Sequence, residues 1–179
     1  MKLPGPPLEQ DNSYPGVNLC GWWSIGRECV RTGIYPTRAR NLATRVMSDV
    51  AEHASRAINQ EAFATVWSDW KHSNQEETTM QDYVETLKND PSLRDGNGCS
   101  DADLMVAAHW LAHMTRPAGI EPASLFTYRE GDEGYKRYSM SRVEIGLGAD
   151  EVDHVSDVIL CNRVSLHWTP TQAIISDNV

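Results

Sequence analysis

The sequence changes its pattern near Pro117, and this change constrains the fold more than any other feature. Before Pro117, apolar residues recur at helical spacing in segments bounded by Ser, Thr, Gly, Asn or Pro. After it, short segments rich in β-branched and aromatic residues alternate with Gly, Asp and Asn, as strands and turns do. Helices followed by strands predict an α+β fold, in which a helical N-terminal two thirds packs on a C-terminal, mostly antiparallel sheet.

Local signals place the expected elements. The helices cover residues 20–32, 39–58, 61–70, 79–88 and 101–114, and the strands cover residues 123–130, 135–146, 154–162 and 163–170. We expect Thr37 to cap the second helix and Thr78 or Thr79 to cap the fourth. Ser100 and Asp103 resemble an acidic variant of the capping box before the last helix. The whole chain, residues 1–179, is predicted as a single domain, with residues 1–17 as an irregular lead-in rich in Pro, Gly and Asn.

Charge and hydropathy narrow the classes of partner. The formal net charge is −9, and only Arg38, Arg40 and Arg45 form a basic cluster, so we expect no nucleic-acid partner. An acidic surface suits a protein partner with basic or mixed charge better. No apolar run approaches the ~18–20 residues that cross a bilayer, so no membrane is expected. The N-terminal segment lacks the apolar stretch of a signal peptide, which predicts an intracellular, cytoplasmic protein.

The cysteines and histidines show no metal-binding spacing. Cys20, Cys29, Cys99 and Cys161 include no CxxC pair, and without a secretion signal we expect no disulfides. His109 and His113 form an i,i+4 pair in HWLAH, but this segment lacks the glutamate of HExxH and has no evident third ligand. The sequence therefore predicts that these histidines bind no metal and that the protein needs no cofactor.

The segment NLCGWWSI, residues 18–25, sets a cysteine at the start of the first expected helix. Unpaired N–H groups and the helix dipole favour a thiolate at such a position, so Cys20 is a candidate nucleophile. The N–H of Cys20 and the amide side chain of Asn18 are candidate donors to an oxyanion. Gly21 would allow a substrate backbone to approach closely. The alternative is that Cys20 is a small buried side chain under two tryptophans.

A nucleophilic thiol needs a base, and His167 is the best-placed histidine. It follows an apolar strand and a turn in VILCNRVSLHW and precedes Trp168. A histidine on a late strand that faces a helix N-terminus has the geometry of a Cys–His dyad. The alternative is that His167 is an ordinary strand residue.

Three segments in this order resemble the papain-like cysteine proteases, and most of all the ovarian tumour (OTU) deubiquitinases and related viral proteases. They are NLCGWWSI at residues 18–25, TMQDYVETLKNDPSLRDGNGCSDADLMVAAHWLA at residues 79–112 and VILCNRVSLHWTP at residues 158–170. The resemblance implies a papain-like, OTU-like fold with Cys20 as nucleophile and His167 as base. It also implies a substrate groove, for which we expect Gly21, Trp22 and Trp168.

The sequence departs from the OTU pattern at the third catalytic residue. The family reads Asp-Gly-Asn-Cys at its nucleophile, whereas residues 17–20 read Val-Asn-Leu-Cys, and Thr169 stands two positions after His167. The candidates for the group that orients the imidazole are Thr169, Asn162, Asp157, Asp11 and Asn12; a dyad without such a group is the alternative. Residues 95–99, Asp-Gly-Asn-Gly-Cys, nearly match the family motif, but a nucleophile at Cys99 would leave most of the helical region upstream.

The resemblance implies a cysteine protease that cleaves isopeptide or peptide bonds after a ubiquitin-like C-terminal tail, with ubiquitin or a ubiquitin-like protein as partner. The divergent motifs indicate a viral or bacterial effector that acts in the host cytoplasm. One alternative is a viral papain-like protease that processes its own polyprotein. Another is a catalytically inactive pseudo-protease that serves as a protein-binding module.

Overall fold

The computed structural model describes residues 19–64, 68, 79–89, 99–140, 146–147, 152–153, 155–163 and 167–170. Within these elements the side chains at positions 62, 146, 147, 163, 167, 169 and 170 lie outside the description. The expected lead-in, residues 1–17, and the candidates Asp11, Asn12 and Asn18 also lie outside the described residues. Among the helices of the described part of the chain, none is long and apolar enough to cross a membrane.

In the part of the chain that the structure describes, five helices precede the strands, as the sequence predicts. They are α1 (Cys20–Arg31), α2 (Leu42–Ser55), α3 (Ala57–Ala62), α5 (Met80–Lys88) and α6 (Asp101–His113). Capping boxes at Thr79 with Asp82 and at Ser100 with Asp103 confirm two of the expected helix starts. Residues 61–70, which we expect to continue the helical region, are helical at 61, 62, 64 and 68, while residues 65–67 and 69–70 lie outside the description.

The second helix is shorter than predicted, and Thr37 does not cap it. Its N-cap residue is Asn41, in the left-handed conformation (φ 52°), and the helix ends before the extended residue Arg56. Packing explains this start: a Cβ built on Gly26 of α1 would lie 2.6 Å from the Cβ of Leu42. The missing side chain at Gly26 therefore allows the first turn of α2 to approach α1 closely.

The strands form one five-stranded sheet in the order β3-β2-β1-β4-β5. They are β1 (Leu125–Gly131), β2 (Gly134–Ser139), β3 (Gly146–Leu147), β4 (Val158–Arg163) and β5 (His167–Pro170). Three of the pairings are antiparallel, but the central pair, β1 with β4, is parallel. The sheet is therefore mixed, which corrects part of the prediction of a mostly antiparallel arrangement.

Asp157 explains why β1 and β4 run in the same direction. Its carboxylate accepts the N–H of Ser124, 2.9 Å away, and the next residue, Val158, donates its N–H to the carbonyl of Ser124 at 2.9 Å. These bonds start β1 and β4 at the same end of the sheet. A hairpin with β2 already occupies the other edge of β1, so β4 pairs along the free edge.

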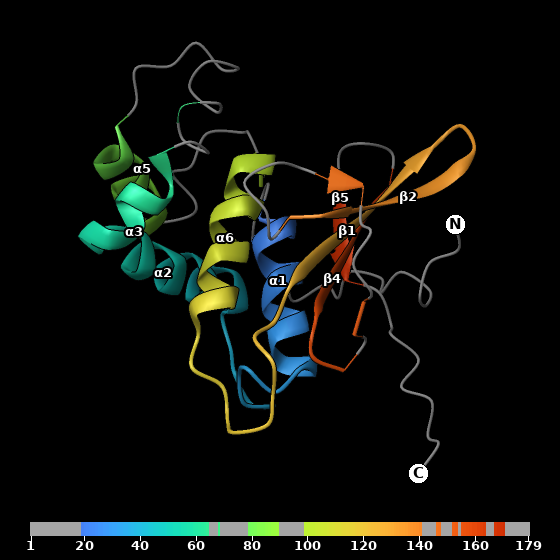
Figure 1. Ribbon diagram of the computed structural model, residues 1–179, viewed down its shortest axis with the longest axis horizontal. Helices are drawn as coiled ribbons and strands as arrows, with labels where there is room; N and C mark the ends of the chain where they lie inside the picture. The colour runs from blue at the N-terminus through green and yellow to red at the C-terminus, as the bar shows by residue number, and fades with distance from the viewer. Residues whose placement is uncertain are drawn as a thin grey trace.

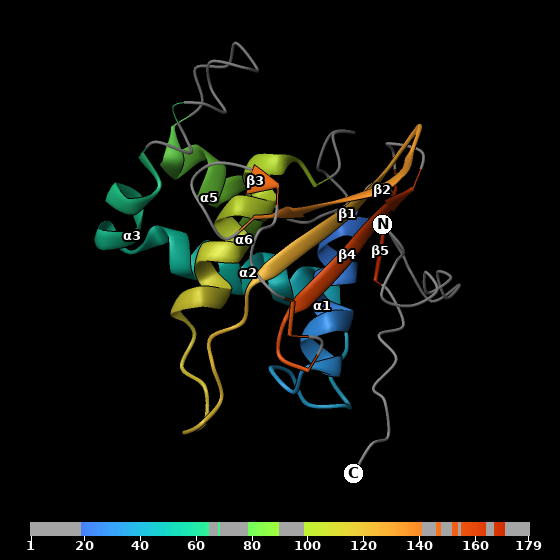
Figure 2. The same cartoon turned by 45° about the vertical axis from the view of Figure 1, so that its right-hand side comes forward.

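Helix α1 lies at the centre of the molecule, between the sheet and the other helices (Figure 1). It packs against β4 and β5 on one side and against α2 on the other, and α5 packs on the far side of α2. In the turned view, β4 crosses in front of α1 (Figure 2). The side chains of Trp22 and Ile25 are fully buried in this core. Helix α1, near the start of the described chain, is therefore in contact with β5, its last strand.

A buried ion pair attaches α1 to the start of β4. Glu28, 1% exposed, accepts the main-chain N–H of Ile159 at 2.9 Å and pairs with Arg31 at 2.6 Å. Arg31 also donates to the carbonyl of Asp157 at 2.7 Å. Burial raises the pKa of Glu28, against the opposing effect of Arg31. The network fixes the position of α1 relative to the sheet.

Candidate active site

Cys20 is the first residue of α1, as the sequence predicts. Leu19 occupies the N-cap position with φ −100° and ψ 7°, and its side chain makes no capping hydrogen bond. The first N–H groups of a helix have no partner within the helix, and an anion at this end is favoured by the helix dipole. The thiol of Cys20 therefore lies at a helix end whose N-cap residue brings no side-chain acceptor.

The last strand reaches the thiol through Trp168. The N–H of Trp168 donates to Sγ of Cys20 at 3.5 Å, and its carbonyl accepts the hydroxyl of Ser24 at 3.1 Å. Its indole N–H donates to the carbonyl of Cys99 at 3.2 Å. Because the amide nitrogen of Trp168 is bonded to the carbonyl carbon of His167, the main chain of His167 lies beside the thiol. The side chain of His167 lies outside the described residues.

The expected groove residues differ in their surroundings. Trp22 is 0% exposed, so it belongs to the core and cannot line a groove, which corrects the prediction. A Cβ at Gly21 would lie 2.2 Å from the Cβ of Cys99 and 3.3 Å from the indole of Trp168. The glycine therefore admits the turn before α6, and close packing explains it without a substrate. Trp168, buried between α1 and this turn, covers the thiol on one side.

Two of the four cysteines are unsuited to react with a macromolecule. Cys29 and Cys161 are fully buried, and desolvation raises the pKa of Cys29, with a further contribution from the charge of Glu28. Cys20 and Cys99 are each 7% exposed and both contact Trp168. Cys99, however, precedes a helix whose N-terminus is closed by the capping box of Ser100.

Of the candidates for orienting His167, Asp157 has another role. Its second carboxylate oxygen accepts the N–H of Asp153 at 2.8 Å, so both oxygens hold main-chain groups at the start of β4. Asn162 lies in β4 directly opposite Trp168 and is buried. Thr169 follows Trp168 in β5, and its side chain lies outside the described residues.

A second group of polar side chains lies away from Cys20. His53 from α2 meets His109 and His113 from α6, and one ring nitrogen from each lies within 4.8 Å of the others. Nε2 of His53 and Nδ1 of His109 are 2.8 Å apart. Burial, and then the charges of His109 and His113, lower the pKa of His53 to about 4. Desolvation also lowers the pKa of His109.

The sequence analysis missed His53 as a member of this group. The sequence shows no third ligand beside the pair His109 and His113, because His53 lies 56 residues before His109 in the chain. A signal was present: His53 continues the apolar stripe of Val46 and Val50 in α2 and is 7% exposed. A histidine in a buried position of a helix needs a polar partner.

Comparison with known proteins finds similarity in the fold and none in the sequence. No protein-family model and no curated protein matches the sequence. Among solved structures, the chain is similar to a crystal structure of an OTU deubiquitinase from Wolbachia pipientis wMel bound to ubiquitin. The TM-score is 0.54 at 14% sequence identity, over 87% of this chain and 90% of the other. The protein therefore has an OTU-like fold, which confirms the fold that the sequence motifs imply.

Proposed function

We propose that the protein is an OTU-type cysteine protease that hydrolyses isopeptide or peptide bonds after the C-terminal tail of ubiquitin or a ubiquitin-like protein. One observation carries this proposal: the main chain at His167 and Trp168 lies against the thiol of Cys20 at the start of α1. The OTU-like fold supports it, because the similar structure is a deubiquitinase bound to ubiquitin. A viral or bacterial effector that acts in the host cytoplasm stays a prediction from the sequence.

In the proposed reaction, His167 takes the proton of the Cys20 thiol, and the thiolate attacks the carbonyl carbon at the end of the ubiquitin tail. The N–H of Cys20 and the amide of Asn18 donate hydrogen bonds to the oxyanion. His167 then gives its proton to the leaving amine, and a thioester remains on Cys20. Water hydrolyses the thioester, which frees the tail and restores the thiol.

The surroundings of Trp168 support this assignment. Its three hydrogen bonds, to Cys20, Ser24 and Cys99, fix the strand on which His167 lies. Thr169 and Asn162 stay candidates for orienting the imidazole, and a dyad is the alternative. Trp168 would flank the approach of the tail to the thiol.

A second candidate function is a binding module without catalysis. The observation that favours it is the loss of acidic or amide groups at the two positions that the OTU pattern uses, where this chain has Val17 and Thr169. The third candidate, Asp157, is committed to main-chain N–H groups. Such a module would bind ubiquitin through the same fold and leave the bond intact.

A ubiquitin probe with a C-terminal electrophile tests the proposal. We expect the full-length protein to form a covalent adduct, and Cys20→Ala to form none, because only this thiol lies at the start of α1. Cys99→Ser is the matched control, and it should react like the unchanged protein. His167→Ala should slow the reaction by about a thousandfold or more.

Two results would contradict the proposal. An adduct on Cys99 that survives Cys20→Ala would move the nucleophile to the turn before α6. Binding of ubiquitin without any adduct would favour the non-catalytic module.

A further inference from the structure

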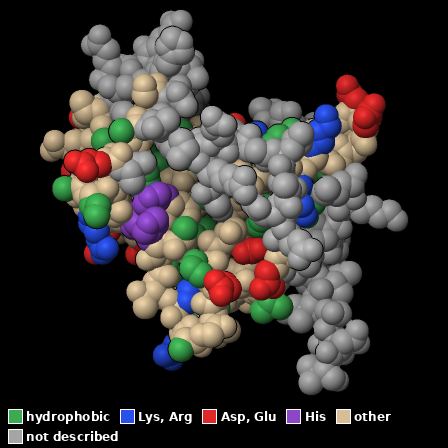
Figure 3. All heavy atoms as spheres, viewed as in Figure 1, with side chains coloured by type: hydrophobic (Ala, Val, Ile, Leu, Met, Phe, Trp, Pro, Cys, Tyr) green, Lys and Arg blue, Asp and Glu red, His purple; other side chains and the backbone are tan. Residues whose placement is uncertain are grey.

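We propose that His53, His109 and His113 form a Zn²⁺ site that joins the C-terminal ends of α2 and α6. The sequence predicts no metal here because the third ligand was not in view, and the structure supplies this ligand from α2. Histidine side chains form a purple patch at the surface (Figure 3), and the exposed member of the cluster is His113. Three imidazoles form a ligand set that Zn²⁺ uses, with water at the fourth position.

The spacing of the ring nitrogens is close to what a zinc ion requires. Two nitrogens bound to one tetrahedral zinc at about 2.0–2.1 Å lie about 3.4 Å apart. The rings of His109 and His113 are stacked, with centroids 4.0 Å apart and planes inclined by 16°, so their edges lie side by side. Nε2 of His53 lies 2.8 Å from Nδ1 of His109. The three nitrogens all lie within 4.8 Å of one another, so the rings must rotate to place three lone pairs around one ion.

The hydrogen bonds of the cluster agree with neutral imidazoles. Nδ1 of His113 lies 2.9 Å from the carbonyl of His109, and a carbonyl only accepts, so this nitrogen carries a proton and Nε2 keeps a lone pair. The 2.8 Å contact between His53 and His109 requires one proton between two ring nitrogens. A metal ion would replace that proton. The amide nitrogen of Asn59 donates to Nδ1 of His53 at 3.3 Å, so in the metal-free protein Nε2 of His53 carries the proton. A metal ion at Nε2 therefore requires the proton to leave this nitrogen and the contact with Asn59 to change.

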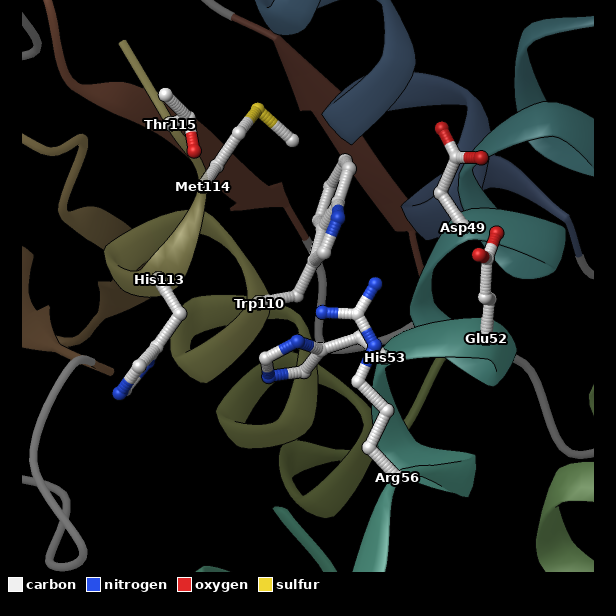
Figure 4. Close-up of a pocket in the computed structure, with 8 residues that line it drawn as sticks. All are labelled: Asp49, Glu52, His53, Arg56, Trp110, His113, Met114 and Thr115. Carbon is white, nitrogen blue, oxygen red and sulfur yellow. The ribbon is translucent and has the colours of Figure 1, made fainter. Parts of the chain in front are cut away.

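The local field favours a cation. His53 lies in the last turn of α2, and His113 ends α6, so the negative ends of two helix dipoles meet at the cluster. Asp49 and Glu52 lie on one wall of the adjoining pocket and His113 and Met114 on the opposite wall (Figure 4). Arg56 opposes a cation from the same pocket. The charge of Arg56 also contributes to the lowered pKa of His53, so it acts against the two helix ends.

Access to the site is graded from closed to open. His53 is buried, His109 is half-buried and His113 is exposed, so an ion can enter from the solvent side. The adjoining cavity has a volume of about 290 Å³ and can hold the water that completes the coordination. The site lies at the opposite end of α6 from Cys99 and Trp168, about 20 Å along a helix of this length. The ion would thus connect two helices and take no part in the proposed proteolysis.

Zinc titration of the chelator-treated, full-length Cys20→Ala protein tests the site, because this background removes the thiol most able to bind zinc elsewhere. We expect one ion per chain, a rise in Tm on saturation, and a tetrahedral visible spectrum when Co²⁺ replaces Zn²⁺. His113→Gln changes an exposed side chain and should weaken binding at least about tenfold. Glu52→Gln is the matched control and should bind almost as tightly, because this carboxylate is not one of the three ligands.

The titration also has outcomes that would overturn the site. One is the absence of stoichiometric binding by the Cys20→Ala protein. Another is zinc affinity in His113→Gln and in His109→Gln equal to that of the Cys20→Ala background, with each variant shown to be folded by circular dichroism. A third is binding lost in Glu52→Gln but kept in His113→Gln, which would assign the ion to the carboxylates. The ubiquitin probe reports separately on Cys20, so neither experiment decides the other.

Discussion

The N-termini of α1 and α6 both contact Trp168, yet they are built in opposite ways. At α6, Ser100 and Asp103 satisfy each other's main-chain N–H groups. At α1, Leu19 offers no side-chain acceptor, and Cys20 follows it directly. A closed helix end gives stability, whereas an open one leaves N–H groups for a charge that develops during a reaction. The difference favours Cys20 over Cys99 as the proposed nucleophile.

The two helices also differ in what holds them. The carboxylate of Asp103 in α6 accepts the N–H of nearby Ser100 and also the hydroxyl of Tyr83. Helix α1 depends on distant partners, since Ser24 bonds Trp168 and Glu28 bonds Ile159. Local capping therefore stabilises α6, whereas side-chain bonds to the sheet hold α1 and its first N–H groups receive no side-chain cap.

The largest effect is expected when the distant support of α1 is removed. Glu28→Ala should lower the free energy of unfolding by about 3–5 kcal/mol, because it leaves Arg31 and the N–H of Ile159 without their buried acceptor. Urea denaturation followed by circular dichroism measures this change. Glu28→Gln is the control and should lose less, since the amide oxygen can still accept from Ile159. Equal stability of Glu28→Ala and the unchanged protein would show that the sheet does not hold α1.

A smaller effect is expected at the capped helix. Asp103→Ala should lower the free energy of unfolding by about 2–3 kcal/mol, because it removes the acceptor for Ser100 and Tyr83. Tyr83→Phe separates the two contributions and should cost about 1 kcal/mol. The same denaturation measurement applies. A loss at Asp103 larger than the loss at Glu28 would reverse the comparison between the two helices.

The smallest effect is expected on the pH dependence of stability, and it comes from His53, which contacts the C-terminal part of α6. The pKa of His53 is lowered to about 4, so between about pH 6.5 and pH 4 the unfolded chain binds a proton that the folded chain does not. In metal-free protein, stability should therefore fall as the pH decreases through this window, by about 2 kcal/mol from this residue. Stability curves of the unchanged protein and His53→Gln measure the contribution. Parallel curves would show that His53 is as easily protonated in the folded state.

The sequence was sufficient where the signal is local. Each of the capping boxes, at Thr79 and at Ser100, spans only four residues, and both helix starts are confirmed. The start of α1 at Cys20 and the order of helices before strands are confirmed for similar reasons. Thr37 failed as a cap because the close contact of Leu42 with Gly26, far away in the chain, decides where α2 begins.

The remaining features depend on contacts between distant residues. The parallel pairing of β1 with β4 follows from the bonds of Asp157 to Ser124, and no periodicity predicts it. The burial of Trp22 follows from the position of α1 between two layers. His53 joins a pair 56 residues away, so its role is visible only after α2 and α6 are packed. The roles of Cys20 and His167 in catalysis stay predictions.

The hydrogen bond between Trp168 and Cys20 joins residues 148 positions apart, so it can form only late in the synthesis of the chain. A ribosome releases α1 early, and β5 emerges only after every helix and the other strands. Throughout that interval the thiol has no neighbouring strand, since contacts of such long range form only when both segments are free to meet. The growing polypeptide thus carries the proposed nucleophile before it has the strand on which the proposed base lies. Under the proposed mechanism, reaction at Cys20 requires the arrival of β5.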